Sequence, residues 1–260
     1  MKESDNSKSP APALTRALAV LEALAQDPYE MNQAELAEKL DIPPASLWRI
    51  LKVLTDGEYL ILDRKRHTYR FGFKLMRLGS AMLNEGHFRS QGREFLRKLS
   101  DQTGETAELD VRIRDQLVLI DQVVGANAVY LYSHIGSTMP YFHATAPGKV
   151  FLSRMERTKL HRVMNKIGFP RLTPHTIQDL EALERELARV AAAGYAIDVE
   201  EMREGVGRAA APVMDDHDRI VGVIAIACPA FRLREPGLAL EYGRLVKEAA
   251  DEMSTARGAV

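Results

Sequence analysis

The stretch from Asn32 to Leu54, NQAELAEKLDIPPASLWRILKVL, constrains the fold of this chain most, because it predicts two short helices joined by a tight turn. Asn32 is a favourable N-cap residue, and Glu35 three positions later completes a capping box. Pro43 disfavours the α region at the residue before it, so the first helix ends there. Pro44 fits the first turn of the second helix, where a missing N–H costs no hydrogen bond.

The second of these helices has two distinct faces. Its apolar residues recur at helical spacing and are expected to face inward: Leu47, Ile50, Leu51 and Leu54. Its hydroxyl, aromatic and basic residues lie away from that stripe: Ser46, Trp48, Arg49 and Lys52. A helix that packs on its own domain while presenting such groups outward suits the recognition of base edges and phosphates in DNA. Two capped amphipathic helices also occur in folds that do not bind nucleic acid, so this stretch alone leaves both interpretations open.

The neighbouring segments predict the rest of a winged helix-turn-helix. An Ala- and Leu-rich helix begins after Pro12 and is ended by Asp27 and Pro28. We expect this helix to pack across the other two through Leu14, Leu18, Leu21 and Leu24. Two β-prone runs, Tyr59–Asp63 and Thr68–Phe73, predict a hairpin. A two-stranded hairpin is marginal alone, so it must pack against the helices.

The tip of the predicted hairpin is basic and comprises Arg64, Lys65, Arg66 and His67. More cations follow, and no acidic residue occurs between Asp63 and Glu85. The whole chain has 35 basic and 36 acidic residues and a formal net charge of −1, so the excess is local. A solvated loop of like charge is the alternative. Because a helix-turn-helix pattern precedes the hairpin, we interpret the tip as a wing that reaches flanking phosphates or the minor groove.

Length and composition limit the number of domains and the classes of protein to which the chain can belong. The 260 residues leave room for about two domains. The single cysteine, Cys228, excludes an internal disulfide and a multi-cysteine metal site, and it fits a reducing compartment. No apolar run approaches the about 18 residues of a membrane span. Residues 1–12 are rich in Ser, Pro and charge and have no apolar core, so we expect a disordered arm rather than a signal peptide. We therefore expect a cytoplasmic protein.

Beyond the hairpin, the segment 74–103 predicts helix that Gly86 interrupts. We expect four parts along the chain: a disordered arm at 1–12, the winged helix-turn-helix at 13–73, a linker helix at 74–86 and a second domain at 87–260. The apolar side of the linker helix comprises Leu75, Leu78 and Met82. Such a side can pair with the same helix of another subunit or pack on its own domain, and the sequence leaves both open.

The second domain predicts an antiparallel sheet covered by helices, which makes the chain α+β. Strand patterns occur at 107–115, 117–125, 128–136, 195–200, 209–215 and 220–229. Helices are predicted from about 149, at 160–166, at 177–194 and at 235–256. Short turns join the first three strands, as expected for neighbouring antiparallel strands.

Four segments together resemble the IclR family of transcriptional regulators. They are the helix-turn-helix above, RHTYRFGFKLMRLG (66–79), HATAPGKVFLS (143–153) and GYAIDVEEMREGVGRAAAPVMDDHDRIVGVIAIACPAFR (194–232). The resemblance runs in order through almost the whole chain from Leu14 on. It implies an N-terminal winged helix domain that binds double-stranded operator DNA and a C-terminal GAF-like domain that binds a small-molecule effector. It also implies assembly as a homodimer or a dimer of dimers.

The residues expected to contact DNA lie around the two helices and on the wing tip. They are Asn32, Gln33, Ala45, Ser46, Leu47, Trp48, Arg49, Lys52, Arg64, Lys65, Arg66 and His67. In a dimer, two copies of the second helix must lie about 34–36 Å apart, or a multiple of that, to enter successive major grooves.

By resemblance, the effector pocket would be walled by Ala146, Pro147, Gly148, Asp198, Arg208, Ala225, Ala227 and Cys228. We interpret Tyr130, Tyr141, Phe142 and His143 as a roof over that pocket, with His143 as a further ligand contact; the alternative is that these aromatic residues belong to the core. The family often has Cys at the position of Arg208 and Ser at the positions of Ala225 and Ala227. The fixed charge of Arg208 suits a carboxylate, so we expect an aromatic or aliphatic carboxylate as effector. Alternatively, Arg208 forms a structural salt bridge with Asp198, Glu200 or Glu201.

Enzymatic chemistry finds little support. GVGRAA at Gly205 has the spacing of a dinucleotide loop, but it follows an acidic stretch, and Pro212 blocks a helix after it. No hydrolase, zinc-protease or nucleotide-binding signature occurs, so we expect no catalytic residue, no metal and no cofactor. The sequence therefore predicts a ligand-responsive regulator, a repressor or dual regulator of a catabolic operon. The alternative is an enzyme or carrier of a small organic acid whose N-terminal helices contact protein.

Overall fold

The computed structural model describes residues 9–25, 30–84, 87–114 and 116–258. The chain divides into two compact units, residues 1–86 and 87–260, and each has a core of its own. Within the described ranges, no helix is long and apolar enough to cross a membrane. The predicted arm before residue 9, the helix end at Asp27 and Pro28 and the break at Gly86 lie outside the described residues.

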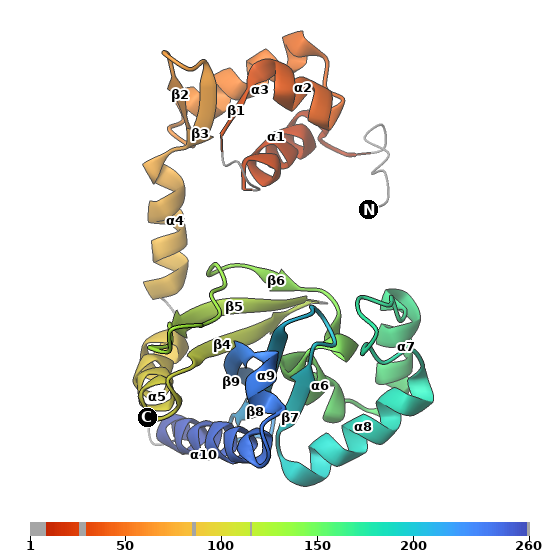
Figure 1. The fold of residues 1–260 in the computed structure, drawn as a ribbon. Helices are drawn as coiled ribbons and strands as arrows, with labels where there is room; N and C mark the ends of the chain where they lie inside the picture. The colour runs from red at the N-terminus through yellow and green to blue at the C-terminus, as the bar shows by residue number, and fades with distance from the viewer. Residues whose placement is uncertain (1–8, 26–29, 85–86, 115, 259–260) are drawn as a thin grey trace. The chain divides into compact units, whose positions relative to one another are not determined.

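The first unit has the predicted winged helix-turn-helix architecture (Figure 1). Its elements are α1 (Pro12–Leu24), β1 (Met31–Asn32), α2 (Gln33–Leu40), α3 (Pro44–Asp56), β2 (Leu60–Asp63), β3 (Thr68–Phe71) and α4 (Phe73–Asn84). The predicted capping box is confirmed, because Asn32 N donates to Glu35 Oε2 over 2.8 Å while Glu35 N donates to Asn32 Oδ1 over 3.0 Å. The hairpin of β2 and β3 is confirmed as well, and β1 adds a third antiparallel strand that the sequence did not reveal.

The core of this unit corrects one expectation about α1. The inward residues of α3 are buried as predicted, but α1 contributes Val20, Ala23 and Leu24 to the core. Leu14 is 60% exposed and Leu18 is 51% exposed, so the predicted leucine face is wrong over the first half of the helix. The helix is apolar nearly all round, and periodicity cannot select the buried side of such a segment.

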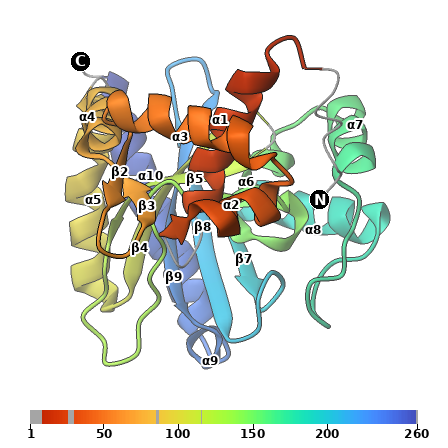
Figure 2. The ribbon, with the colours of Figure 1, turned by 90° about the horizontal axis from the view of Figure 1, so that it is seen from above.

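The second unit is a six-stranded antiparallel sheet with helices on both faces (Figures 1 and 2). Its elements are α5 (His87–Thr103), β4 (Thr106–Ile113), β5 (Gln116–Val123), β6 (Thr138–Met139), the 3-10 helix η1 (Phe142–Ala144), α6 (Ala146–Ser153), α7 (Arg157–Ile167), α8 (Leu180–Ala193), β7 (Ala196–Val199), β8 (Val206–Met214), β9 (Ile220–Pro229), α9 (Ala230–Leu233) and α10 (Leu238–Gly258). The strand order is β6-β5-β4-β9-β8-β7, which confirms the predicted α+β class.

The two faces of this sheet carry separate cores. Alternate residues of β8 and β9, such as Ala209 and Ile226, pack with Leu96 of α5 and Val246 of α10. The opposite face packs against η1, α6, α7 and α8. Side chains alternate between the two faces along each strand. Charged strand residues that point to the second face therefore lie either under these helices or at the part of the face that the helices do not cover.

The predicted third strand at 128–136 is wrong. Only Thr138 and Met139 pair with β5, and the segment before them is irregular. Tyr130 and Tyr132 are exposed, so the alternating apolar residues that predicted a strand are not buried against any core. This irregular segment instead borders the open edge of the sheet.

Candidate nucleic-acid interface and ligand cavity

The outer face of α3 is open to solvent, as the helical spacing predicts. Trp48 is 53% exposed, and Ala45 and Arg49 are exposed beside it. Arg49 forms no salt bridge with any described residue, whereas Lys52 pairs with Asp56 over 3.0 Å. Arg49 is therefore the cation of this face whose hydrogen-bond donors are uncommitted within the described chain.

Three residues predicted to contact DNA have contacts within the first unit. Leu47 is fully buried in the core of the first unit, so its assignment as a DNA contact is wrong; it belongs to the inward stripe of α3. The Asn32 side chain caps α2. Gln33 Nε2 donates to the Pro44 carbonyl over 3.2 Å and so joins the starts of α2 and α3. The half-buried Ser46 remains at the start of α3 beside the exposed residues.

The wing tip is a compact turn that displays four exposed side chains, those of Arg64, Lys65, Arg66 and His67. Asp63 Oδ1 accepts hydrogen bonds from the backbone N–H of Lys65 and of Arg66, over 2.8 and 3.1 Å. These bonds lower the pKa of Asp63, so the carboxylate that shapes the turn stays charged.

The cations of the tip are not equivalent. Arg66 pairs with Glu30 over 3.0 Å, while Arg64 and Lys65 form no salt bridge with any described residue. Further along, Lys74 donates to the Gly57 carbonyl and lies 4.5 Å from the ring centre of Tyr59, so it joins α4 to the wing. Arg64 and Lys65 are therefore the cations of the tip that have no ion-pair partner among the described residues.

The second unit contains a cavity of about 360 Å³ at the edge of its sheet. Its walls come from β4, β5, β6, β8, the irregular segment before β6 and the loop before β8: Glu108, Leu119, Leu131, Tyr132, Ser133, His134, Ser137, Thr138, Met139, Met202, Arg203, Val206 and Arg208. Of the nine residues predicted to bind an effector, only Arg208 lines this cavity. The aromatic wall is Tyr132, whereas the predicted roof residues Tyr130, Tyr141 and Phe142 do not line it.

Arg208 forms a salt bridge whose partner the sequence did not reveal. Its Nε donates to Glu108 Oε2 over 3.1 Å, and the other oxygen of Glu108 lies 3.2 Å from Ser133 Oγ. The predicted partners Asp198, Glu200 and Glu201 are therefore wrong. Glu108 and neighbouring carboxyls raise the pKa of Arg208, so its guanidinium is always charged. The Nη nitrogens of Arg208 have no hydrogen-bond partner among the described residues.

The sheet register places Ala225 and Ala227 on one face of the sheet and Cys228 on the other. Ala227 pairs with Arg208, so both side chains share the face that carries the cavity, and Ala225 follows on the same face. Cys228 points to the opposite face and packs in the core with α5 and α10, so its assignment to the effector pocket is wrong. Burial raises the pKa of Cys228 to about 12, which makes it a core thiol rather than a nucleophile.

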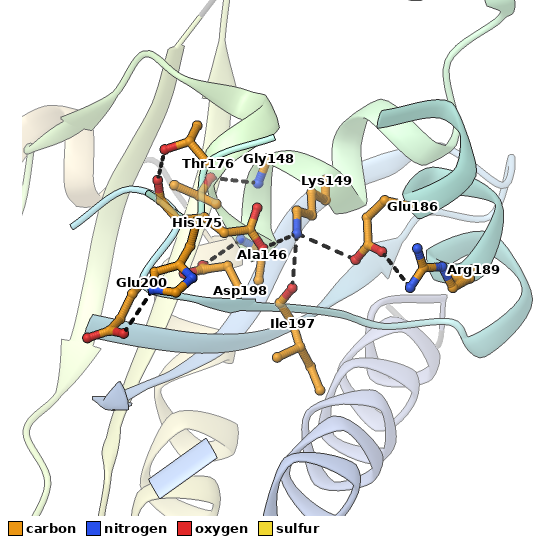
Figure 3. Close-up of polar contacts among 12 residues, drawn as sticks. Ala146, Gly148, Lys149, His175, Thr176, Glu186, Arg189, Ile197, Asp198 and Glu200 are labelled. Carbon is orange, nitrogen blue, oxygen red and sulfur yellow. Dashed lines mark hydrogen bonds and ion pairs between the residues drawn. The ribbon is translucent and has the colours of Figure 1, made fainter. Parts of the chain in front are cut away.

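The start of α6 is tied to β7 by buried polar contacts (Figure 3). Asp198 Oδ2 accepts from Ala146 N over 2.8 Å, and burial raises the pKa of Asp198. A side chain at Gly148 would collide with the Phe142 backbone, so only glycine fits there. Pro147 lies between these two positions in the buried first turn. The predicted residues of α6 thus build the interior rather than the cavity wall.

Lys149 is the centre of this buried network, with only 1% of its side chain exposed. Its Nζ lies 2.5 Å from Glu201. It also lies 3.4 Å from Glu186 and donates to the Ile197 carbonyl (Figure 3). Burial raises the pKa of Glu201 to about 7 despite the ammonium beside it. Since Met202 follows Glu201 and lines the cavity, this salt bridge anchors one cavity wall.

His143 is buried between two aromatic rings, with ring-centre distances of 6.4 Å to Tyr141 and 5.3 Å to Phe169. Burial lowers its pKa, so it is neutral near pH 7. It does not line the cavity described above. Among the described residues, no group of three or more His, Cys, Asp or Glu side chains is arranged to hold a metal ion.

Both units match known protein families. Residues 13–63 match the IclR helix-turn-helix domain, and residues 80–255 match the family described as bacterial transcriptional regulator IclR C-terminal. The chain is 33% identical to the HTH-type transcriptional repressor AllR of Klebsiella pneumoniae, over 99% of this chain and 94% of that protein.

Solved structures share the fold. The Thermotoga maritima IclR structure is similar with a TM-score of 0.78 at 26% identity, covering 94% of this chain and 98% of that one. An IclR homologue from Microbacterium hydrocarbonoxydans, complexed with 4-hydroxybenzoate, is similar with a TM-score of 0.79 at 21% identity, covering 94% of this chain and 98% of that one.

Proposed function

Because this chain belongs to the IclR family of bacterial transcriptional regulators, we propose that it is a ligand-responsive, sequence-specific repressor or dual regulator of a catabolic operon. The observation that carries this proposal is a set of exposed cations on α3 and the wing that have no ion-pair partner among the described residues: Arg49, Arg64 and Lys65. Repression is proposed because the similar protein AllR of Klebsiella pneumoniae is a transcriptional repressor.

The proposed division of labour follows the predicted domains. Residues 13–73 bind double-stranded operator DNA, 74–86 form the linker helix, and 87–260 bind the effector. α3 enters the major groove, and the wing contacts phosphates beside it. The protein acts where bacterial DNA lies, in the cytoplasm.

Dimerisation through α4 is part of the proposal. Phe73, Met76 and Leu78 of this helix are exposed in the single chain, so a second copy of the helix has an apolar surface to cover. A homodimer, or a dimer of dimers, places two recognition helices about 34–36 Å apart or a multiple of that. An effector then changes DNA affinity only if it binds one spacing better than another.

The effector is proposed to be a small carboxylate or aromatic acid that occupies the cavity at Arg208. Two guanidinium groups, Arg203 and Arg208, face one carboxylate, Glu108, among its walls. The uncommitted Nη nitrogens of Arg208 are suited to bidentate binding of a carboxylate. The complex of the Microbacterium homologue with 4-hydroxybenzoate, an aromatic carboxylate, supports this class of effector.

A mobility-shift experiment on the DNA upstream of the chain's own gene tests the proposal. The Arg49→Ala/Arg64→Ala variant is expected to lose binding, because it removes a base-reading donor and a wing charge that has no partner among the described residues. The matched control, Arg185→Ala/Arg244→Ala, removes two exposed arginines of the second unit and is expected to bind as the wild type does. Unchanged binding by the first variant would remove the proposed interface.

A further inference from the structure

The outer face of α3 carries apolar side chains that its own core does not use. Trp48 is 53% exposed and Val53 is 69% exposed, and Ala45 lies in the arc between them. The opposite side of the helix holds the buried leucine stripe. At about 100° per residue, Trp48, Ala45 and Val53 lie on one outer arc of the helix, together with the charged residues Arg49, Lys52 and Asp56.

The charges around this surface indicate which partner covers it. Arg49 lies within the same arc, and the free cations Arg64 and Lys65 lie on the wing of the same unit. A second copy of this face would bring Arg49 against its own counterpart. A DNA duplex instead supplies phosphates for the cations and apolar methyl groups for Trp48, so the groove of DNA is the complementary partner.

We propose that α3 reads thymine C5-methyl groups through Trp48, next to a guanine bound by Arg49. This inference rests on the proposed function and specifies what the recognition helix reads. In the major groove, thymine alone among the bases presents a methyl group, and guanine presents the O6 and N7 acceptors that an arginine binds in bidentate fashion. Adjacent residues of a helix point about 100° apart, so Trp48 and Arg49 reach different bases.

The paired state of Lys52 strengthens the assignment. Lys52 lies between Trp48 and Arg49 on the outer arc, but its ammonium is held by Asp56 over 3.0 Å. Base reading by hydrogen bonds therefore falls to Arg49, and reading by apolar contact falls to Trp48. Trp48 is also the single tryptophan of the chain, so its fluorescence reports directly on this contact.

The test begins with selection of duplexes from a random-sequence pool by the full chain. Each thymine of the enriched site is then replaced by deoxyuridine, which removes only the methyl group. Loss of a contacted methyl is expected to lower affinity about fourfold, as for one buried methylene-sized group. The same replacement in the flanking sequence is the control and is expected to have no effect.

Two variants make the result specific. Trp48→Ala is expected to bind thymine and deoxyuridine duplexes equally, because the contact is already gone. Arg49→Ala is expected to keep the methyl sensitivity and to lose the preference for guanine. Circular dichroism checks that both variants keep the wild-type melting temperature, as solvent-exposed substitutions on an intact helix should.

Several outcomes overturn the proposal. Equal binding of thymine and deoxyuridine duplexes by the wild type removes methyl reading, even if a site was enriched and the proposed function stands. The same fourfold loss in Trp48→Ala assigns the methyl to another residue. If Trp48→Ala instead lowers the assembled mass in light scattering and leaves sequence preference intact, the face is a subunit contact. If no duplex is enriched, the proposed function fails together with this inference.

Discussion

The two units of this protein use charge in opposite ways. In the first unit, Arg49, Arg64 and Lys65 are exposed and unpaired within the described chain. In the second unit, Lys149 and Arg208 are buried and held by carboxylates. An exposed, uncommitted cation is available to a polyanion, whereas a buried pair fixes the positions of the strands and helices around it.

The exposed cations of the first unit are thus expected to contribute to binding, and the buried ion pairs of the second unit to stability. Neutralising Arg49, Arg64 or Lys65 is expected to change binding and leave stability intact, because these cations have no partner to lose among the described residues. Neutralising a buried cation of the second unit leaves carboxylates without compensation and is expected to change stability. The predictions below are ordered by the size of the expected effect.

Lys149→Met is expected to have the largest effect. It removes the ammonium that holds Glu201 and Glu186, so unfolding free energy of the second unit should fall by about 3–5 kcal/mol. Chemical denaturation followed by circular dichroism measures this loss. The control is Lys98→Met, which breaks the exposed pair with Glu252 and should cost less than about 1 kcal/mol. Equal losses in both variants would show that burial of Lys149 does not set its contribution.

Glu201 is expected to make the stability of the second unit depend on pH. Its pKa is about 7 in the folded state against an ordinary value of 4.5, so the folded state holds the proton more tightly. Its contribution is full below pH about 4.5 and is lost as pH rises through about 7, by about 3 kcal/mol in total. Glu201→Gln should flatten that part of the stability profile. A profile with the same slope in both proteins would assign the effect elsewhere.

Arg49→Ala is expected to lower affinity for the selected duplex roughly 10- to 100-fold, because it removes a bidentate contact to a base. Fluorescence anisotropy measures the affinity, and denaturation of the same variant should match the wild type. A variant that is destabilised but binds normally would reverse the contrast between the two units.

Asn32→Ala is expected to have the smallest effect, a loss of about 1 kcal/mol, since it removes the side-chain cap of α2. Asp179→Ala removes the corresponding cap of α8 in the second unit and should cost a similar amount. Caps are local, so the two units should not differ here. Thermal melting of both variants shows whether the contrast is confined to charged residues.

The same contrast explains how far the sequence could predict the structure. The capping box at Asn32, the buried stripe of α3 and the exposed Trp48 depend on residues a few positions apart, and all were predictable. The pairing of Arg208 with Glu108 joins residues on separate strands, and no local pattern indicates it. Sequence periodicity also failed at 128–136, where strand-like alternation occurs in a segment that no core covers.

Errors in the predicted ligand site have the same origin. Cys228 and Ala227 are adjacent in sequence but lie on opposite faces of the sheet, and the choice of face depends on the strand register. Leu47 was assigned both to the core and to the DNA contact, and burial leaves only the first role. Of the cavity-wall residues, Arg203 comes from a loop that carries no periodic signal, and Ser133 comes from the segment 128–136, whose alternation wrongly predicted a strand.

The salt dependence of DNA binding tests the central claim most directly, which is that free cations of the first unit contact phosphates. For the wild type, log Kobs against log salt concentration should fall linearly, with a slope of about −0.9 for each phosphate contact. The Arg64→Ala/Lys65→Ala variant should make that slope shallower by about 1.8, while Arg185→Ala should leave it unchanged. A slope that is the same in the wing variant and the wild type would contradict the account.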